Sequence, residues 1–300
     1  MVNSSSLYNE AKTDGDLTIL ILGASGMLGN SLFRYLSKNN RFNVYGSVRG
    51  PKNIVEIPQN LQNKIIKNLN IEKFDDVLKI FSTIRPNIVI NCIGLVKQLA
   101  ASNDILSAIP INSILPHRLS NACDIIGARF IHFSTDCVFS GAKGMYKESD
   151  FADADDVYGR TKFLGEVHGD TSITLRTSII GHELMGSRSL ISWFLAQSEV
   201  VQGYRQAIFS GLPTVEVARV IQDLVIPNLD LAGVFHLSSE PISKYALLEL
   251  VAKQYKKNIK IIPNDYVVLD RSLDSTKFRL ATGFTPKPWG QLVELMHDFQ

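Results

Sequence analysis

A tyrosine and a lysine four residues apart could act together in proton transfer. The segment reads Tyr158-Gly159-Arg160-Thr161-Lys162, and this spacing puts the first and last side chains on one face of a helix. A phenol is a poor acid–base group at neutral pH, because its reference pKa is about 10. An ammonium one turn away stabilises the phenolate and lowers that pKa. The spacing therefore predicts that Tyr158 and Lys162 form a proton-transfer pair.

A second polar segment, Ser134-Thr135-Asp136, closes an apolar stretch that has the character of a buried strand. In open α/β sheets the ligand crevice lies beyond the carboxyl ends of the strands. We therefore expect the hydroxyl of Thr135 to hold a substrate oxygen beside Tyr158. A lone Tyr-x-x-x-Lys pattern is more often an exposed helix face. The glycine loop, the Ser-Thr pair and the Tyr-Lys pair follow one another in the expected order, and this order favours catalysis.

A glycine-rich loop, Gly23-Ala24-Ser25-Gly26-Met27-Leu28-Gly29, joins the first expected strand to the first expected helix. The first glycine allows a tight turn, and the others let the backbone approach a pyrophosphate at the helix N-terminus. The alternative is a glycine-rich turn with no ligand, which the position in a first βα unit disfavours. We assign this loop to a dinucleotide, with its contacts at Gly23, Ser25, Gly26, Met27, Leu28 and Gly29.

The residues after the second expected strand indicate which nicotinamide cofactor binds. NAD sites usually place a carboxylate on the ribose hydroxyls at this point, but no Asp or Glu occurs between Asn30 and Val55. The strand ends instead at Ser47-Val48-Arg49, and a guanidinium can grip a 2′-phosphate. The sequence therefore predicts NADPH, with Ser47 and Arg49 at the adenosine end. Cys92 and Gly94, at and just after the end of a later strand, belong to the predicted cofactor contacts. Tyr158 and Lys162 complete the set, with Lys162 expected to bind the nicotinamide ribose.

The elements that must position these residues alternate from Leu17 onward. The expected strands are Leu17–Leu22, Phe42–Val48, Lys64–Leu69, Asn87–Cys92, Arg129–Ser134, Ser172–Thr177 and Val234–Leu237. The expected helices are Met27–Ser37, Phe74–Ile84, Pro110–Ile126, Asp156–His168 and Thr214–Leu224. This alternation predicts an α/β fold with a doubly wound parallel sheet of the Rossmann type.

The same pattern predicts how the chain is divided. Residues 1–16 are polar and read as a flexible tail without the apolar stretch of a signal peptide. Residues 17–178 and 212–237 are expected to form the dinucleotide-binding domain. Residues 179–211 and 238–300, where the alternation is less regular, are expected to form a smaller α/β substrate-binding lobe.

Composition excludes several classes of protein. The net charge is +2, and 31 basic and 29 acidic residues are interspersed, which disfavours a nucleic-acid binder. Three cysteines and six scattered histidines show no metal-ligand spacing, so we predict no metal and a reducing, cytoplasmic location. The longest apolar stretch, Ile88 to Val96, is too short to span a bilayer, so we expect no membrane association.

Beyond these features, the chain resembles the dTDP-4-dehydrorhamnose reductase family over nearly its whole length apart from the tail. The resemblance is carried by Ser134-Thr135-Asp136-Cys137-Val138-Phe139-Ser140-Gly141, Tyr146-Lys147-Glu148-Ser149-Asp150, the segment from Tyr158 to Lys162, and Gly165-Glu166. Further matches are Asn112, Arg176-Thr177, Pro213-Thr214, Arg271 and Leu273-Asp274. Three features depart from the family pattern: Leu22 replaces a common Thr, Cys137 replaces a common aromatic residue, and Leu184–Gln206 matches nothing recognisable.

The resemblance implies a reaction and roles for residues. Thr135, Tyr158 and Lys162 would be the catalytic residues, and Asn112 would hold a water that relays protons to the lysine. The implied reaction is NADPH-dependent reduction of the 4-keto group of a nucleotide-linked 6-deoxyhexos-4-ulose, in the synthesis of bacterial surface-polysaccharide sugars.

The expected partner is a nucleotide sugar, whose diphosphate needs cations from the substrate lobe. Arg188, Arg205 and Arg271 are the candidates, and Arg271 is the first choice because it lies in a stretch that resembles the family. The full predicted substrate set is Asp136, Val138, Arg176, Arg205 and Arg271. A homodimer is compatible with these features.

Two other functions stay open. A sugar-nucleotide dehydratase or epimerase could use the same scaffold, but dehydration typically needs an Asp-Glu pair beside the catalytic Thr, and here Cys137 follows Asp136. A non-catalytic, NADP-binding regulatory subunit, like that of methionine adenosyltransferase, could also have this fold. The intact Thr135, Tyr158 and Lys162 argue against that role.

Overall fold

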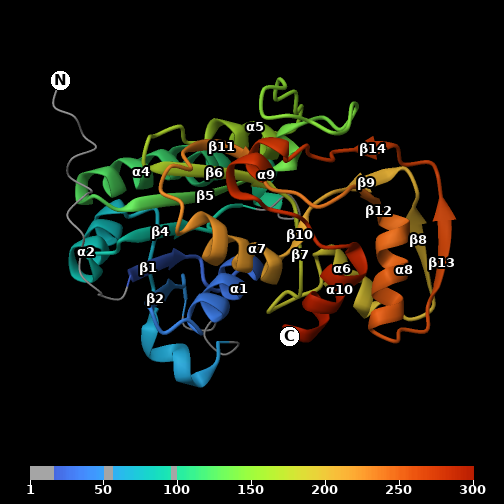
Figure 1. The fold of residues 1–300 in the computed structure, drawn as a ribbon, viewed down its shortest axis with the longest axis horizontal. Helices are drawn as coiled ribbons and strands as arrows, with labels where there is room; N and C mark the ends of the chain where they lie inside the picture. The colour runs from blue at the N-terminus through green and yellow to red at the C-terminus, as the bar shows by residue number, and fades with distance from the viewer. Residues whose placement is uncertain (1–16, 51–56, 96–99) are drawn as a thin grey trace.

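A seven-stranded parallel sheet forms the centre of the computed structural model, which describes residues 17–50, 57–95 and 100–300. The strand order is β11-β6-β5-β4-β1-β2-β3 (Figure 1). The strands are β1 (Leu17–Leu22), β2 (Phe42–Ser47), β3 (Ile65–Ile66), β4 (Ile88–Asn91), β5 (Arg129–Thr135), β6 (Ser172–Thr177) and β11 (Gly233–His236). The order reverses between β1 and β4, which is where ligands bind in such sheets. The predicted doubly wound α/β fold is confirmed.

Helices cover both faces of this sheet, and β1 shows why. Its side chains alternate, so that Ile19 and Ile21 enter one buried cluster while Leu20 and Leu22 enter another on the opposite face. The main helices around the sheet are α1 (Met27–Leu36), α2 (Phe74–Ile84), α4 (Leu115–Ile126), α5 (Val157–Leu164) and α7 (Thr214–Val220). A strand buried on both faces must be apolar throughout, as the sequence of β1 is.

One predicted helix, Pro110–Ile126, differs from the observed structure. The chain forms a short helix α3 (Ile105–Ala108), then a π-helical turn over Ile109–Ile114, and only then α4. The side chain of Asp104 caps α3 by accepting from two backbone N–H groups. Pro116 lies four residues after Asn112 and has no N–H to donate to its carbonyl. The regular helical ladder is therefore interrupted at Asn112.

A second group of elements lies at the end of the molecule opposite α2 (Figure 1). It contains α6 (Leu190–Ala196), α8 (Lys244–Gln254), and the paired strands β8 (Val200–Tyr204) and β13 (Lys260–Asn264). Its own hydrophobic cluster includes Phe194, Leu247 and Val251. The remaining elements are β7 (Ile179–Ile180), β9 (Ala207–Phe209), β10 (Leu212–Pro213), β12 (Ile242–Ser243), β14 (Leu269–Asp270), α9 (Thr276–Thr282) and α10 (Trp289–Asp298).

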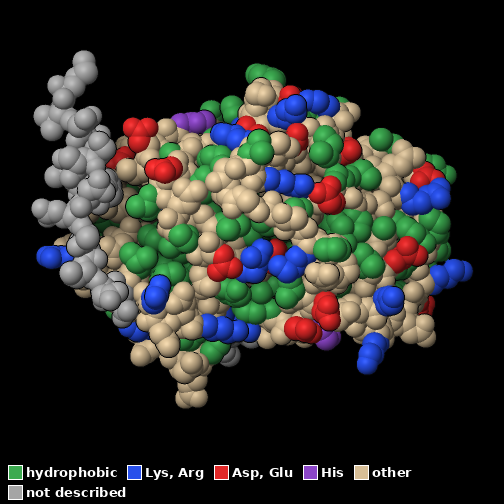
Figure 2. Space-filling view, in the orientation of Figure 1, with side chains coloured by type: hydrophobic (Ala, Val, Ile, Leu, Met, Phe, Trp, Pro, Cys, Tyr) green, Lys and Arg blue, Asp and Glu red, His purple; other side chains and the backbone are tan. Residues whose placement is uncertain are grey.

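The C-terminal part of the chain returns to the main sheet. Phe278 of α9 is fully buried in the same cluster as β11, and its ring contacts that of Phe235 edge-on. Basic and acidic side chains are interspersed on the face that Figure 2 shows. Within the described ranges, none of the helices combines the length and apolar character needed to cross a bilayer.

Candidate active site

The glycine loop is held in place by the end of β2. Gly23 has a φ of 88°, which is the left-handed region that favours glycine. Its N–H donates to Ser47 Oγ (3.3 Å), and the N–H of Ala24 donates to the carbonyl of Ser47 (2.8 Å). A Cβ added at Gly29 would lie only 2.2 Å from the carbonyl oxygen of Gly23. Glycine is therefore required at Gly29 by the fold of the loop itself.

The loop leaves room for an anionic group at the start of α1. The first N–H groups of a helix have no acceptor within it, and the helix dipole is positive there. Gly26 is exposed, and a Cβ added to it would make only an ordinary contact, 3.4 Å from the carbonyl of Gly23. These features fit the pyrophosphate of a dinucleotide. Ser25 and Met27 are partly exposed beside Gly26, whereas the side chain of Leu28 is buried.

The adenosine end of the predicted cofactor site contains Arg49, which is exposed directly after the buried Val48. Ser47 is buried and its hydroxyl bonds the glycine loop, so its side chain holds the loop. No carboxylate follows β2 in the sequence up to Val55. This arrangement suits a 2′-phosphate better than free ribose hydroxyls.

Lys162 lies at the inner end of the site. Its ammonium is buried and donates to the carbonyl oxygen of Phe133 at 2.7 Å. Burial lowers the pKa of Lys162 to about 8, although the carboxylate of Glu166 opposes this effect. A Cβ added at Gly94 would lie 3.4 Å from Asn112 Oδ1 and 3.9 Å from Lys162 Nζ. The structure therefore brings Gly94, Asn112 and Lys162 together.

Asn112 is fixed by the chain on both sides of it. Its Oδ1 accepts from the N–H of Leu95 (2.9 Å), and its Nδ2 donates to Thr161 Oγ1 (3.3 Å). A Cβ added at Gly165 would lie 1.9 Å from the carbonyl oxygen of Asn112. This contact packs the end of α5 tightly on the π-helical turn. Cys92, just after β4, is hydrogen-bonded through its N–H to the carbonyl of Leu22.

Thr135 and Tyr158 meet at the carboxyl end of β5. Thr135 Oγ1 donates to Asp136 Oδ1 (3.1 Å) and accepts from the N–H of Cys137 (3.1 Å). Burial raises the pKa of Tyr158, the nearby thiol of Cys137 adds to the increase, and a hydrogen bond with Thr135 partly offsets it. This direction is opposite to the lowering that the Tyr-Lys spacing predicts. The ammonium of Lys162 bonds the backbone of Phe133, and a phenolate is costly in a dry site.

Asp136 and Arg271 lie next to this pair. Burial raises the pKa of the Asp136 carboxyl, while the Thr135 hydroxyl and the Arg271 guanidinium act in the opposite direction. Arg271 Nε donates to the carbonyl oxygen of Phe139 (2.8 Å), and Nη1 lies 3.9 Å from Cys137 Sγ. The guanidinium of Arg271 is therefore fixed at the edge of the candidate catalytic group.

Three residues of the predicted substrate set, Arg176, Val138 and Arg205, do not present their side chains to the candidate catalytic group. Arg176 is buried in a two-point ion pair with Glu166, at 2.7 Å for both hydrogen bonds, so its guanidinium has no face for a substrate. The side chain of Val138 is fully buried in a cluster with Phe139 and Leu273. Arg205 is exposed and pairs with Asp265, which follows β13. We leave these three side chains out of the proposed substrate site.

The third candidate cation, Arg188, is exposed in the segment between β7 and α6. Its backbone N–H donates to Glu183 Oε2 at 2.8 Å, and that carboxylate also accepts from the N–H of Ser189. Glu183 therefore organises this turn, and Arg188 projects from it without a structural link to Thr135 or Tyr158.

Sequence reasoning gave no role to Glu166, although Gly165-Glu166 belongs to the segments that resemble the family. Its carboxylate accepts from Ser134 Oγ at 2.7 Å in addition to the pair with Arg176. The available signal was a carboxylate four residues after Lys162, on the same helical face. Gly159 also went unnoticed: a Cβ there would lie 2.2 Å from the carbonyl oxygen of Cys137.

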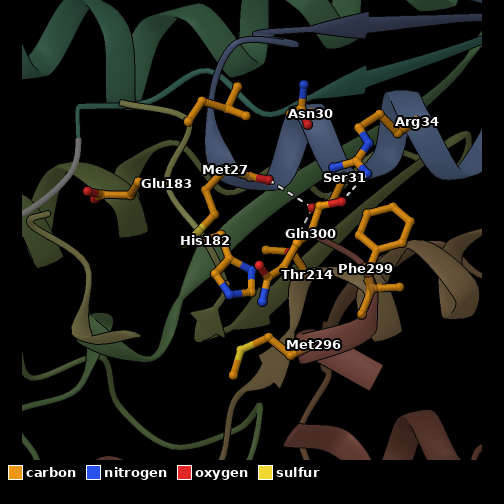
Figure 3. A pocket seen from close by; sticks show the side chains of 13 residues that line it. Met27, Asn30, Ser31, Arg34, His182, Glu183, Thr214, Met296, Phe299 and Gln300 are labelled. Carbon is orange, nitrogen blue, oxygen red and sulfur yellow. Dashed lines mark hydrogen bonds between the residues drawn. The ribbon is translucent and has the colours of Figure 1, made fainter. Parts of the chain in front are cut away.

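A cavity of about 220 Å³ lies beside α1 (Figure 3). Met27, Ser31 and Arg34 line it from α1, and Thr214 and Gln300 close it from the other side. Ser31 Oγ donates to Thr214 Oγ1 (2.8 Å), and Arg34 donates to the backbone carbonyl of Gln300 (2.9 Å). Neither Thr135, Tyr158 nor Lys162 lines this cavity, so it is distinct from the candidate catalytic group.

Among the residues that the structure describes, no group of three or more His, Cys, Asp or Glu side chains is arranged to hold a metal ion. Cys92, Cys123 and Cys137 form no disulfide in the described part of the chain.

Comparisons with known proteins find relatives along the chain. The chain is 27% identical to a dTDP-4-dehydrorhamnose reductase from Aggregatibacter actinomycetemcomitans, over 92% of this chain and 97% of that protein. It is 26% identical to the methionine adenosyltransferase 2 subunit beta of Bos taurus, over 49% of this chain and 41% of that protein.

Solved structures share the fold. The crystal structure of dTDP-4-dehydrorhamnose reductase from Bacillus anthracis str. Ames in complex with NADP superimposes with a TM-score of 0.76 at 20% identity, covering 95% of this chain and all of that one. The family model described as the RmlD substrate binding domain matches residues 17–298. The chain therefore belongs to the RmlD substrate-binding domain family.

Proposed function

We propose that this protein is an NADPH-dependent reductase of the 4-keto group of a nucleotide-linked 6-deoxyhexos-4-ulose. The observation that carries this proposal is the hydrogen bond between Tyr158 and Thr135 at the end of β5, with the Lys162 ammonium on the carbonyl of Phe133 in the same strand. The glycine loop, which fits a pyrophosphate, supports it. The name of the relative that aligns along almost the whole chain, dTDP-4-dehydrorhamnose reductase, supports the same reaction. The proposal includes a place in the synthesis of surface-polysaccharide sugars.

In this mechanism each side chain has one task. NADPH, when bound, supplies the hydride that reduces the carbonyl carbon. Tyr158 donates its proton to the developing alkoxide, and its raised pKa keeps the hydroxyl protonated before the reaction. Thr135 donates a hydrogen bond to the same oxygen. Lys162, whose pKa is about 8, is mostly charged at neutral pH and stabilises the negative charge left on Tyr158.

Proton supply to Tyr158 involves Asn112 in this proposal. Asn112 lies beside Gly94 and Lys162, and Pro116 has no N–H to donate to its carbonyl. A water held by that carbonyl would connect Lys162 to solvent. The tight packing of Gly165 against the same carbonyl supports a fixed position for this group.

Cofactor selection depends on Arg49 in the same proposal. The guanidinium is exposed at the end of β2 and can form two parallel hydrogen bonds to a 2′-phosphate. A carboxylate, which would repel that phosphate, is missing from the sequence as far as Val55. We therefore assign NADPH over NADH.

The nucleotide-sugar diphosphate is assigned to Arg271, with Asp136 facing the sugar. Arg271 Nε donates to the carbonyl oxygen of Phe139 at 2.8 Å, and this bond orients the guanidinium plane. Within the described ranges no hydrogen-bond acceptor is seen for Arg271 Nη2. We infer that residues 179–211 and 238–300 supply the rest of this site. The separate hydrophobic cluster around Phe194 and Leu247 supports a lobe of this kind.

Screening a panel of 4-keto-6-deoxy sugar nucleotides for loss of NADPH absorbance tests the proposal, and NMR of the product locates the reduced carbon. Turnover with reduction at C4 is the expected result. A redox-neutral product would instead indicate a dehydratase or epimerase. NADPH binding without turnover on any member of the panel would indicate a regulatory subunit, a role that the beta-subunit relative makes worth testing.

Two further assignments belong to this proposal. A homodimer is supported by apolar side chains exposed on α3, on α4 and at the end of α5, among them Leu106 (85% exposed), Ile125 (84%) and Leu164 (59%). Light scattering on the purified protein measures the mass directly. An odd number of cysteines, three in all, supports a reducing, cytoplasmic setting for the reaction.

A further inference from the structure

A buried ion pair joins three elements around the candidate catalytic group. Arg176 Nε and Nη2 donate to the two carboxylate oxygens of Glu166, each at 2.7 Å. The Glu166 side chain is 1% exposed and that of Arg176 is 4% exposed. Burying two charges costs more than most pairs return. A pair at this place therefore calls for an explanation other than stability.

The carboxylate of Glu166 also reaches the strand that ends at Thr135. Ser134 Oγ donates to Glu166 Oε1 at 2.7 Å, and Ser134 immediately precedes Thr135. Ser134 and Arg176 lie opposite each other in the paired strands β5 and β6. Glu166 follows the end of α5, the helix that carries Tyr158 and Lys162. One carboxylate thus connects the catalytic helix to two strand ends.

Arg176 in turn is fixed from its other side. Its Nη1 lies 3.3 Å from His236 Nε2, and its guanidinium lies over the ring of Phe139 with 5.3 Å to the centroid. His236 Nδ1 lies 3.0 Å from the carbonyl oxygen of Tyr146. The position of Glu166 is therefore set by a rigid, buried set of contacts.

We propose that Glu166, held by Arg176, is a positioning residue for the reduction. It fixes the position of Lys162 on α5 relative to Thr135 at the end of β5. This inference rests on the proposed function and adds a residue to it. Glu166 touches neither substrate nor cofactor in this scheme and acts through Lys162 and Ser134.

The charges around Lys162 support this role. Besides Glu166, the titratable groups near it are the phenol of Tyr158 one turn earlier on α5, which is neutral because burial raises its pKa, the thiol of Cys92 and the imidazole of His132. Burial raises the pKa of Cys92 and lowers that of His132, so both groups are neutral at working pH. The Glu166 carboxylate is then the anion that favours the charged form of Lys162, against the effect of burial.

Substitution of Glu166 by Gln tests the proposal, because it keeps the shape and the ability to accept from Ser134 but removes the charge. The first readout is the dissociation constant of NADPH between pH 6 and 10, followed by nucleotide fluorescence. Affinity should fall as Lys162 loses its proton, with a midpoint near pH 8 in the wild type. In Glu166→Gln this midpoint should move to lower pH. A shift of about one unit would cut the charged fraction of Lys162 at pH 8 roughly fivefold.

A matched control is available in helix α7. Glu216 of α7 is also 1% exposed and makes a two-point pair with Arg219, at 2.9 and 2.8 Å. Glu216→Gln should lower the unfolding temperature in a comparable way and leave the NADPH midpoint unchanged. If the midpoint of Glu166→Gln stays at the wild-type pH, or if Glu216→Gln moves it equally, the positioning role is refuted.

A milder variant covers the case in which Glu166→Gln does not fold. Ser134→Ala leaves the ion pair intact and removes only the link to β5, so the turnover number should fall by at least threefold while KM and the NADPH midpoint stay unchanged. Wild-type turnover in Ser134→Ala would overturn the proposed link to Thr135. The NADPH titration needs no sugar substrate, so a wrong substrate assignment would show as absent turnover with the expected midpoint shift still present.

Discussion

Two glycines of the same loop should respond to alanine in different ways, because their surroundings differ. A Cβ at Gly29 would lie 2.2 Å from the carbonyl oxygen of Gly23, 2.8 Å from its carbon and 3.2 Å from Ala24 Cα. All three atoms belong to the backbone, so no side chain can rotate away. A Cβ at Gly26 would meet a single atom at 3.4 Å. The fold should therefore tolerate Gly26→Ala and resist Gly29→Ala.

The size of the effect follows from packing. Forcing an extra methyl group into a packed site costs about 1–3 kcal/mol, and a backbone contact of 2.2 Å places Gly29→Ala at the upper end of that range. For a chain of this size each kcal/mol lowers the unfolding temperature by roughly 2–4 °C. We therefore expect a loss of about 6–12 °C for Gly29→Ala and almost none for Gly26→Ala.

NADPH binding should separate the two variants in a second way. Gly26 is exposed at the start of α1, where a methyl group would stand between the backbone and the pyrophosphate. Gly26→Ala should therefore weaken NADPH binding at least tenfold while thermal unfolding without cofactor stays at the wild-type temperature. Differential scanning fluorimetry and fluorescence titration measure both quantities. Wild-type unfolding of Gly29→Ala would show that the loop is looser than these contacts indicate, and would refute the reasoning.

Four other substitutions test individual assignments. Tyr158→Phe should leave NADPH binding intact and lower the turnover number by about 10²–10⁴-fold, the usual contribution of a positioned proton donor; near-normal turnover would remove Tyr158 from the mechanism. Arg49→Asp should reverse or abolish the preference for NADPH, and equal affinity of the wild type for NADPH and NADH would already contradict the assignment. Arg271→Ala should raise KM for the sugar nucleotide without changing NADPH affinity in a direct titration. Lys162→Met should abolish turnover yet raise the unfolding temperature at pH 7. The pKa of Lys162 is about 8 in the folded state, below its usual 10.5, so the charged lysine opposes folding at pH 7. This penalty fades as the pH rises from 8 toward 10.5, because the folded protein then holds a neutral lysine. An unfolding temperature of Lys162→Met below that of the wild type would contradict the prediction.

Much of the fold could be predicted because β1 and the glycine loop obey strong local rules. An apolar strand that ends in Gly23 and leads into a helix has few structural solutions. The π-helical turn at Ile109–Ile114 escaped prediction because apolar spacing does not distinguish it from a regular helix. Pro116, which cannot donate a helical hydrogen bond, was visible in the sequence. Whether the helix changes its pitch there depends on how α5 packs against the turn.

The candidate site was predictable in its parts and less so in its electrostatics. Tyr158 shares a hydrogen bond with Thr135, and Lys162 bonds the carbonyl of Phe133 two residues before Thr135; their catalytic roles stay a prediction. The direction of the Tyr158 pKa was wrong, because burial raises it and the Lys162 ammonium bonds the backbone of Phe133. Sequence alone reports neither burial nor this contact. Arg176 was assigned to substrate because a strand-end arginine usually faces the crevice. Its partner, Glu166, lies only ten residues away, yet spacing in sequence does not reveal which arginine a buried carboxylate will bind.

The two outer strands of the main sheet have a consequence for how copies of the chain can associate. β3 has two residues and β11 has four, and each lies at one edge of the sheet (Figure 1). An edge strand exposes a row of unpaired N–H and C=O groups onto which a second chain can add a strand. Edges this short offer few such groups, so cross-chain sheet extension and the aggregation that follows from it are disfavoured. Self-association at a high concentration of the protein is therefore expected through helices, and the seven-stranded sheet stays within one chain.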